Sequence, residues 1–294
     1  MIDSESYITP PRQCILTFGM KRIITALILI PLVLLLVFLG PGWLFTLIVA
    51  GVAALAAWEF LGLAEKTGAS PPRIAVLVAI LALFAGNYYW LGQTAAILGI
   101  LSLALLVYCT FFRSAEQVLA DASTSIFCLF YIGFTLMTLP ALLEETNGPS
   151  LVAFLMCVVW AGDIAALYVG RAWGRHKMAL ALSPNKTWEG ALGSLAGSLL
   201  ATSALLGLAH LFVNGLNKYW LSFSDDLWYW LVLAVVVNAA AQVGDLAESA
   251  LKRSAGVKDS GSLLPGHGGV LDRIDALLLA APALWYAQVI QHWF

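Results

Sequence analysis

Charged residues are scarce in this chain. Asp, Glu, Lys and Arg together make up 11% of its 294 residues, whereas hydrophobic residues make up 61%. A soluble domain carries roughly 25% charged residues. The composition therefore excludes an ordinary water-soluble enzyme and predicts a protein that resides in a lipid bilayer.

Cysteine is also sparse, and the positions of the four cysteines exclude two kinds of site. There is no C-x-x-C pair, and Cys109, Cys128 and Cys157 lie in or at the edge of apolar runs. Such cysteines behave as small core hydrophobic residues, so we expect neither disulfides nor a cysteine-ligated metal. No internal repeat is evident, nor are the matched half-helices interrupted by Gly or Pro that indicate a transporter.

Long apolar runs make up most of the chain. Most of them reach the ~20 residues that a helix needs to cross the hydrocarbon layer. The third and fourth runs are separated only by Gly86-Asn87 and Gly92-Gln93, so they could instead form one re-entrant unit. We predict an all-α, polytopic membrane bundle of about nine transmembrane helices, at residues 23–39, 43–64, 74–90, 91–109, 120–143, 150–172, 188–213, 227–251 and 271–291.

The polar segments define the domain organisation and the topology. Residues 1–19 are polar and predict a disordered N-terminal tail ahead of a single transmembrane domain, residues 20–294. With the predicted spans, the N-terminus and every even-numbered connection share one side, which receives every Lys and Arg except Lys218. The positive-inside rule places this side in the cytoplasm. We therefore expect a multi-pass inner-membrane protein with its N-terminus and its two long polar loops, 172–187 and 252–270, on the cytoplasmic side.

The densest polar cluster begins in the run before the second long loop. If residues 245–252 are helical, Asp245, Glu248, Ser249 and Lys252 follow one another at i, i+3, i+4 and i+7. Residues at this spacing share one helix face. Two carboxylates, a hydroxyl and an ammonium group should therefore face the same way.

The loop that follows this face is rich in glycine. Asp272 and Asp275 repeat the i, i+3 spacing at the start of the next run. Glycines let backbone N–H groups approach an anion closely, and the loop contains Gly256, Gly261, Gly266, Gly268 and Gly269. Carboxylates, fixed cations and a glycine loop together indicate a divalent metal that holds phosphates. The alternative, a solvated loop between two helices, fits so dense a cluster poorly.

A second cluster precedes and follows the first long loop. Asp163 lies inside an apolar run, where a carboxylate costs about 2.5–3.5 kcal/mol and is retained mainly for function. Lys186 and Glu189 are expected to share a helix face at i, i+3; the alternative is an interfacial ion pair. Ser183 and Thr187 suit a helix start, where free N–H groups attract phosphate.

Three other polar residues in the apolar runs have simpler explanations. We interpret Glu59 as an interfacial or paired carboxylate near the cytoplasmic end of the second span. Asp121 suits the first turn of the fifth span, and His210 is more often a packed histidine than a ligand. None of these is predicted to take part in chemistry.

The two polar clusters resemble those of a known family, the phosphatidate cytidylyltransferases or CDP-diacylglycerol synthases. The strings that resemble its signature are Ser249-x-Leu251-Lys252-Arg253, Lys258-Asp259-x-Gly261 and Leu264-Pro265-x-His267-Gly268-Gly269-x-x-Asp272-Arg273-x-Asp275. Also similar are Gly170-Arg171-x-x-Gly174-Arg175 and Ser183-Pro184-x-Lys186-Thr187-x-Glu189-Gly190. The resemblance is strongest over residues 160–275.

The resemblance implies attack by a phosphatidate oxygen on CTP, which gives CDP-diacylglycerol and pyrophosphate, with no nucleic-acid partner and a homodimeric state. Mg²⁺ prefers carboxylate oxygens, so we predict Asp245 and Asp272 as principal ligands, with Asp275, Glu248 and Asp163 as further ligands or as ligands of a second cation. The predicted catalytic residues are Asp245, Asp272, Lys252, Ser249 and His267. The predicted substrate-binding residues are Lys186, Arg253, Lys258, Arg273, Gly268, Gly269, Ser183 and Thr187.

Other activities remain open at this point. A CTP-dependent polyprenol- or phytol-type lipid kinase, or a cytidylyltransferase for ether-linked archaeal lipids, would use a comparable constellation. The intact string from Lys252 to Asp275 favours phosphatidate. A membrane transporter, from a different class, would not need a glycine-rich basic loop on one face only.

Overall fold

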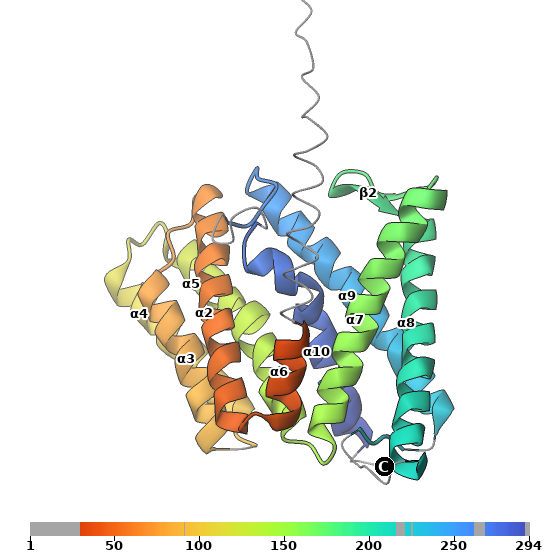
Figure 1. Cartoon of the computed structure of the whole chain (residues 1–294). Coiled ribbons are helices and arrows are strands. Elements are labelled where there is room, and N and C mark those ends of the chain that lie inside the picture. The colour runs from red at the N-terminus through yellow and green to blue at the C-terminus, as the bar shows by residue number, and fades with distance from the viewer. Residues whose placement is uncertain (1–29, 91, 216–220, 225, 262–267, 292–294) are drawn as a thin grey trace, which may run out of the picture.

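The computed structural model is a bundle of helices and describes residues 30–90, 92–215, 221–224, 226–261 and 268–291 (Figure 1). The predicted tail, residues 1–19, and the start of the first span lie outside these residues. The first helix group is α2 (Gly42–Lys66), α3 (Arg73–Tyr89), α4 (Thr94–Phe112), α5 (Val118–Cys128), the π-helical segment η1 (Leu129–Phe134) and α6 (Thr135–Leu143). The second is α7 (Gly148–Trp173), β1 (Lys177–Ala179), β2 (Ser183–Thr187), α8 (Trp188–His210), η2 (Leu211–Gly215), α9 (Leu227–Ser254) and α10 (Leu271–Gln291).

The helix pattern confirms the all-α, polytopic prediction. Within the described residues, 7 helices are long and apolar enough to cross a membrane, with α5, η1 and α6 joined in one of them. Two shorter apolar helices, Ile30–Leu39 and Arg73–Tyr89, occupy the first and third predicted spans. The third and fourth predicted runs form two separate helices, α3 and α4, which pack on each other (Figure 1).

The polar connections gather at one end of the bundle, the upper end in Figure 1. This end contains the antiparallel β1–β2 hairpin, the last turns of α2, α7 and α9, and the first turns of α8 and α10. Every Lys and Arg in the described part of the chain lies at or beside it. The two predicted clusters, far apart in sequence, are therefore brought to the same end.

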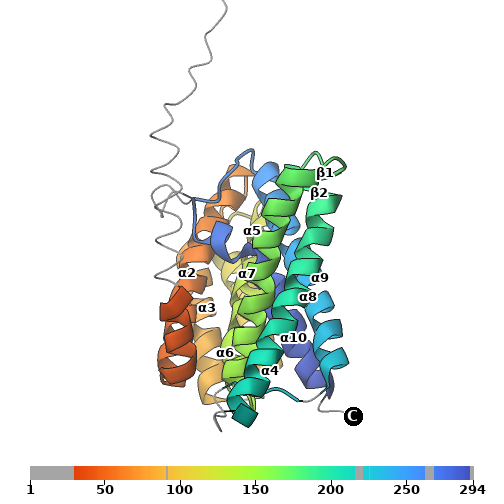
Figure 2. The same cartoon turned by 45° about the vertical axis from the view of Figure 1, so that its right-hand side comes forward.

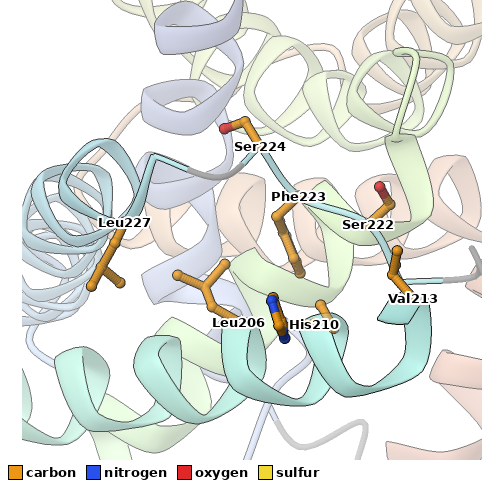
Figure 3. Close-up of a pocket in the computed structure, with 8 residues that line it drawn as sticks. Leu206, His210, Val213, Ser222, Phe223, Ser224 and Leu227 are labelled. Carbon is orange, nitrogen blue, oxygen red and sulfur yellow. The ribbon is translucent and has the colours of Figure 1, made fainter. Parts of the chain in front are cut away.

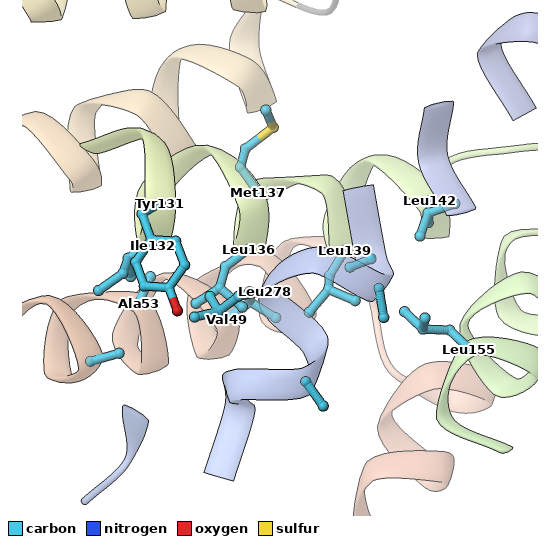
Figure 4. Close-up of a cluster of buried hydrophobic side chains, with 14 of the residues drawn as sticks. Val49, Ala53, Tyr131, Ile132, Leu136, Met137, Leu139, Leu142, Leu155 and Leu278 are labelled. Carbon is cyan, nitrogen blue, oxygen red and sulfur yellow. The ribbon is translucent and has the colours of Figure 1, made fainter. Parts of the chain in front are cut away.

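A shared apolar core joins the two helix groups. The buried side chains in Figure 4 come from α2, η1, α6, α7 and α10 and include Val49, Ala53, Tyr131, Ile132, Leu136, Leu139, Leu142, Leu155 and Leu278. Helix α10 packs on α9 and also on α6 and α2. The loop before α10 is consequently tied to both groups.

Small residues allow α7 and α8 to pack closely along most of their length (Figure 2). A Cβ atom added at Gly193 would lie 2.5 Å from Cβ of Val169, and one added at Gly197 would lie 2.4 Å from Cβ of Ala165. Such close backbone approach is the usual means of packing helices in lipid, where no hydrophobic effect drives helices together. Helices α7 and α8 together form the surface on which α9 packs.

We expect Gly197→Ala to destabilise the protein by about 1–3 kcal/mol, the usual cost of overpacking. The added methyl group would also lie 3.0 Å from the carbonyl oxygen of Ala161. Gly207→Ala, in the same helix, is the matched control because its Cβ would meet no atom within 4 Å. Thermal unfolding in detergent should give a lower midpoint for the first variant only; equal midpoints would contradict the close packing of α7 on α8.

A buried polar network fixes α9 against α7 and α8. Nδ2 of Asn238 donates to Oγ of both Ser194 and Ser198 at 2.8 Å. Nε2 of Gln242 donates to Oδ1 of Asn238 at 2.7 Å, and Ser198 donates to the carbonyl oxygen of Val158 at 2.7 Å. In lipid these groups must be satisfied within the protein. The network sets the height and rotation of α9, and with them the position of the polar face one turn further on.

Candidate active site

The predicted polar face of α9 is present. Helix α9 contains Asp245, Glu248, Ser249 and Lys252, as the spacing predicts. Glu248 is fully buried and Nζ of Lys252 lies 2.5 Å from its Oε2. Oε1 of Glu248 has no hydrogen-bond partner in the described part of the chain. The face therefore places one ion pair inside the bundle and leaves Asp245 partly exposed.

The first turn of α10 supplies the opposite side of the cluster. Oδ1 of Asp272 accepts a hydrogen bond from Nζ of Lys252 at 2.6 Å. Its Oδ2 accepts from the backbone N–H groups of Ser260 at 3.0 Å and Gly269 at 2.8 Å. Lys252 thus bridges Glu248 and Asp272, and Asp272 ties both ends of the glycine-rich loop to α10.

Glycines bring the acidic residues of different helices together. A Cβ atom at Gly244 would lie 2.6 Å from the carbonyl oxygen of Asp275, so α9 and α10 cross closely beside Asp245. A Cβ atom at Gly162 would lie 2.7 Å from Nδ2 of Asn238, so α7 crosses α9 closely beside Asp163. Each of these glycines directly precedes an acidic residue. The acids of α7, α9 and α10 are brought together by close helix crossings.

Asp163, Asp245 and Asp275 form a cluster of like charge. Asp245 and Asp163 interact electrostatically, and Asp275 interacts with both. Nζ of Lys186 lies 2.7 Å from Oδ2 of Asp245, which compensates one of the three charges. Within the described residues, no three His, Cys, Asp or Glu side chains form a ready coordination shell. The donor chemistry nevertheless fits a hard divalent cation, because the oxygen atoms outnumber the positive groups that face them.

The β1–β2 hairpin carries Lys186 into this cluster. Thr187 is the N-cap of α8, and its Oγ1 accepts from the N–H of Gly190 at 3.1 Å. The same oxygen would lie 2.8 Å from a Cβ at Gly174, so the glycine turn after α7 lets the hairpin pack against that helix end. Ser183 opens β2, whereas α8 begins only at Trp188, so the prediction that Ser183 lies at a helix start is wrong and only Thr187 occupies that position.

The predicted shared face of Lys186 and Glu189 is wrong. Lys186 belongs to β2, and α8 begins only at Trp188, so the i, i+3 relation of a helix does not apply. Lys186 instead pairs with Asp245, and Oε1 of Glu189 lies 2.6 Å from Nδ1 of His176. Glu189 also accepts the N–H groups of Arg175 and His176 at 3.2 Å. It braces the hairpin, and the interfacial ion pair between Lys186 and Glu189 is not formed either.

The remaining predicted residues differ in how exposed they are and in what they contact. Nε of Arg253 donates to the carbonyl oxygen of Leu182 at 3.1 Å, which joins the end of α9 to the hairpin. Lys258 and Arg273 are exposed, and Ser249 is buried. Gly268 has φ of +78°, and a Cβ there would lie 2.7 Å from Oδ2 of Asp272. His267 lies outside the described residues.

A separate cavity lies at the opposite end of the bundle. It has a volume of about 430 Å³ and is lined by α8, η2 and the segment before α9 (Figure 3). His210 is exposed and faces it, which corrects the prediction of a packed histidine. None of the predicted site residues lines this cavity, so it is not the candidate active site.

The comparison with known sequences covers almost the whole chain. The model of the family described as "Cytidylyltransferase family" matches residues 20–290. The chain belongs to the cytidylyltransferase family. The match includes both helix groups and every described residue of the two polar clusters, which confirms the resemblance found in the sequence.

Individual members of the cytidylyltransferase family match over similar lengths. The phosphatidate cytidylyltransferase of Brucella suis is 37% identical over 272 residues, which cover 90% of this chain and 91% of that protein. That of Haemophilus influenzae is 34% identical over 292 residues, covering 90% and 97%. That of Staphylococcus aureus is 32% identical over 268 residues, covering 90% and 96%.

Two residues outside the predicted set lie beside the candidate site, because Ser260 is hydrogen-bonded to Asp272. Glu59 of α2 and Ser260 of the glycine-rich loop are buried and hydrogen-bonded to each other at 3.0 Å. Glu59 is thus paired, one of the two interpretations that its sequence position suggested. Its isolation as an acid in an apolar span was the available signal, as it was for Asp163.

Proposed function

We propose that the protein is a phosphatidate cytidylyltransferase, which transfers CMP from CTP to phosphatidate and gives CDP-diacylglycerol and pyrophosphate. The observation that carries this proposal is the similarity to phosphatidate cytidylyltransferases over 90% of the chain. The acidic and basic groups at one end of the bundle suit a reaction between two polyanions.

The chemistry requires positioning more than a strong base. A phosphomonoester has a second pKa of about 6, so at neutral pH phosphatidate already carries an anionic oxygen. This oxygen attacks the α-phosphorus of CTP, the bond from that phosphorus to the bridging oxygen of the β-phosphate breaks, and pyrophosphate leaves. Repulsion between the reactants is the main barrier, and fixed cations reduce it. Lys186, Arg253, Lys258 and Arg273 are the proposed phosphate-binding residues, with Ser183 in β2 and Thr187 at the start of α8.

The acids are proposed to hold Mg²⁺. Bound there, the ion would neutralise charge on the phosphates and orient them. Asp245 is the principal proposed ligand, with Asp163 and Asp275 beside it, because these three carboxylates face few positive groups. Asp272 and Glu248 stay predicted ligands, but Asp272 already accepts from Lys252, Ser260 and Gly269. Its role in holding the loop is the better supported one.

An apolar groove next to the site suits the lipid substrate. Its volume is about 470 Å³, and it is lined by Phe60, Leu63, Ala64, Thr67, Ser123, Thr124, Phe127, Leu251 and Ser254. It lies between α2, α5 and the last turns of α9, adjacent in sequence to Lys252. Acyl chains entering there would leave the phosphate at the polar end of the bundle.

The charge distribution supports a cytoplasmic site. All described Lys and Arg residues lie at or beside the polar end, and cytoplasmic ends of membrane proteins carry the excess of positive charge. We therefore propose that CTP reaches the site from the cytoplasm. The homodimer that the family resemblance implies stays a prediction.

The test is a transfer assay on the purified full-length protein in detergent. With phosphatidate, CTP and Mg²⁺, we expect CDP-diacylglycerol and pyrophosphate in equal amounts, and we expect EDTA to stop both. Excess Mg²⁺ added after EDTA should restore the rate. Failure to convert any lipid phosphate would contradict the proposed function. Full activity in EDTA would contradict only the assignment of Mg²⁺ and would leave the proposed function intact.

A further inference from the structure

A carboxylate from the first helix group reaches into the loop before α10. Glu59 lies in the last third of α2 and is 5% exposed. Its Oε1 accepts from the N–H of Val270 at 3.0 Å, and its Oε2 accepts from the N–H of Leu271 at 2.9 Å. The first N–H groups of a helix have no partner within the helix and attract negative charge. Glu59 therefore caps α10 from a helix about 200 residues away in the sequence.

The same carboxylate also holds the other end of the loop. Oγ of Ser260 lies 3.0 Å from Oε2 of Glu59 and 3.0 Å from Oδ2 of Asp272. The N–H of Ser260 donates to Asp272 at 3.0 Å. The hydroxyl of Ser260 is within hydrogen-bond distance of both carboxylates and has one hydrogen to donate to them. Glu59, Ser260 and Asp272 thus form one connected unit.

Two glycines of the loop are required by Glu59 itself. A Cβ atom at Gly261 would lie 2.5 Å from Oε1 of Glu59, and the two further atoms nearest to it also belong to Glu59. A Cβ atom at Gly269 would lie 2.1 Å from Oγ of Ser260 and 2.3 Å from Oε2 of Glu59. The anion that these glycines approach in the structure is therefore a side chain of the chain itself.

We propose that Glu59 is a positioning residue for the reaction. It fixes the start of α10, and so places Asp272 and Asp275 opposite the polar face of α9, without contacting substrate. This inference rests on the proposed function, since it assigns Glu59 a role in that reaction. It makes the first helix group part of the catalytic apparatus.

The test compares Glu59→Gln and Glu59→Asp with the wild-type protein. Gln has the shape of Glu, but it replaces one acceptor oxygen with an NH₂ group. That NH₂ group would face a backbone N–H donor and could not accept its hydrogen bond. We expect kcat to fall by about 10- to 100-fold in Glu59→Gln, the usual effect of losing a residue that orients a site. The KM for phosphatidate should stay within about threefold, because Glu59 makes no substrate contact. Glu59→Asp keeps the negative charge, so its kcat should fall less than that of Glu59→Gln.

The matched control is Glu65→Gln in the same helix. Glu65 pairs with Arg73 at 2.5 Å on the exposed surface and touches no part of the loop. It should keep wild-type kcat. Hydrogen exchange gives a second measurement that does not depend on turnover: the amides of Val270 and Leu271 should lose protection in both Glu59 variants and keep it in Glu65→Gln.

A double-mutant cycle tests the contact directly. Gly261→Ala should lower kcat in the wild-type background, where the methyl group meets Glu59, and should have little further effect in Glu59→Ala, where that side chain is gone. Additive effects would overturn the proposal.

Four results distinguish the ways in which the proposal or the proposed function could fail. Wild-type kcat in Glu59→Gln, or lowered kcat with unchanged protection at residues 270 and 271, would overturn the positioning role. Protection lost throughout the bundle in Glu59→Asp would reduce Glu59 to a general stability residue and would also overturn it. If the wild-type protein itself transfers no CMP, it is the proposed function that fails.

Discussion

Replacing Asp245 with Asn is expected to lower kcat by about 10³-fold or more, as when an enzyme loses a central electrostatic group. Within the part of the chain that the structure describes, the side chain of Asp245 forms an ion pair with Lys186 at 2.7 Å, and Asp245 is partly exposed. Asn preserves the shape and removes the negative charge that Asp163 and Asp275 share. Initial rates at saturating CTP measure the effect.

The same substitution should leave the protein folded. Removing one of three mutually repelling carboxylates relieves strain, so the thermal midpoint should stay unchanged or rise, as is common when active-site charge is removed. Glu116→Gln, an exposed acid at the same end of the bundle, is the control and should change neither rate nor midpoint. Asp245→Asn with more than a tenth of wild-type activity would contradict the role assigned to the cluster.

Replacing Lys252 with Met is expected to destabilise the protein by about 3–5 kcal/mol, the cost of removing one partner of a buried ion pair. Nζ of Lys252 lies 2.5 Å from Glu248 and 2.6 Å from Asp272, and the side chains of these residues are 12%, 0% and 10% exposed. Without the ammonium group, two buried carboxylates face each other. Unfolding in mixed detergent micelles should show the lower free energy of unfolding. The variant should also have no turnover.

A second substitution distinguishes the stability effect from the chemical one. Glu248→Gln added to Lys252→Met removes one uncompensated charge and should restore part of the stability, but no turnover. Lys66→Met, at the exposed end of α2, controls for the loss of a lysine. An unfolding free energy of Lys252→Met equal to that of the wild type would contradict the bridging position of Lys252.

Much of the fold could be predicted because its determinants are local. Apolar runs long enough to cross a bilayer gave the helices, and the i, i+3 and i+4 spacing gave the face of α9 that carries Asp245, Glu248 and Lys252. The start of α10 at Leu271 places Asp272 and Asp275 in its first turns, as predicted.

The pairings between distant segments could not be predicted. Lys186 meets Asp245 because a hairpin precedes α8, and the short β2 strand has no periodic signature that separates it from a helix start. Glu59 reaches Val270 only through the packing of α2 on α10. The acids Asp163 and Asp245 were found because charge is rare in apolar runs; their partners depend on helix crossings that no local pattern encodes.

The measurement that tests the account most directly follows two labels in CTP. In one sample the α-phosphate is labelled and in another the γ-phosphate, each with purified protein, phosphatidate and Mg²⁺. The account predicts that the α-label enters the lipid fraction, while the γ-label leaves as pyrophosphate. Transfer of the γ-label into lipid, with release of CDP, would identify a lipid kinase and contradict the cytidylyl transfer proposed here.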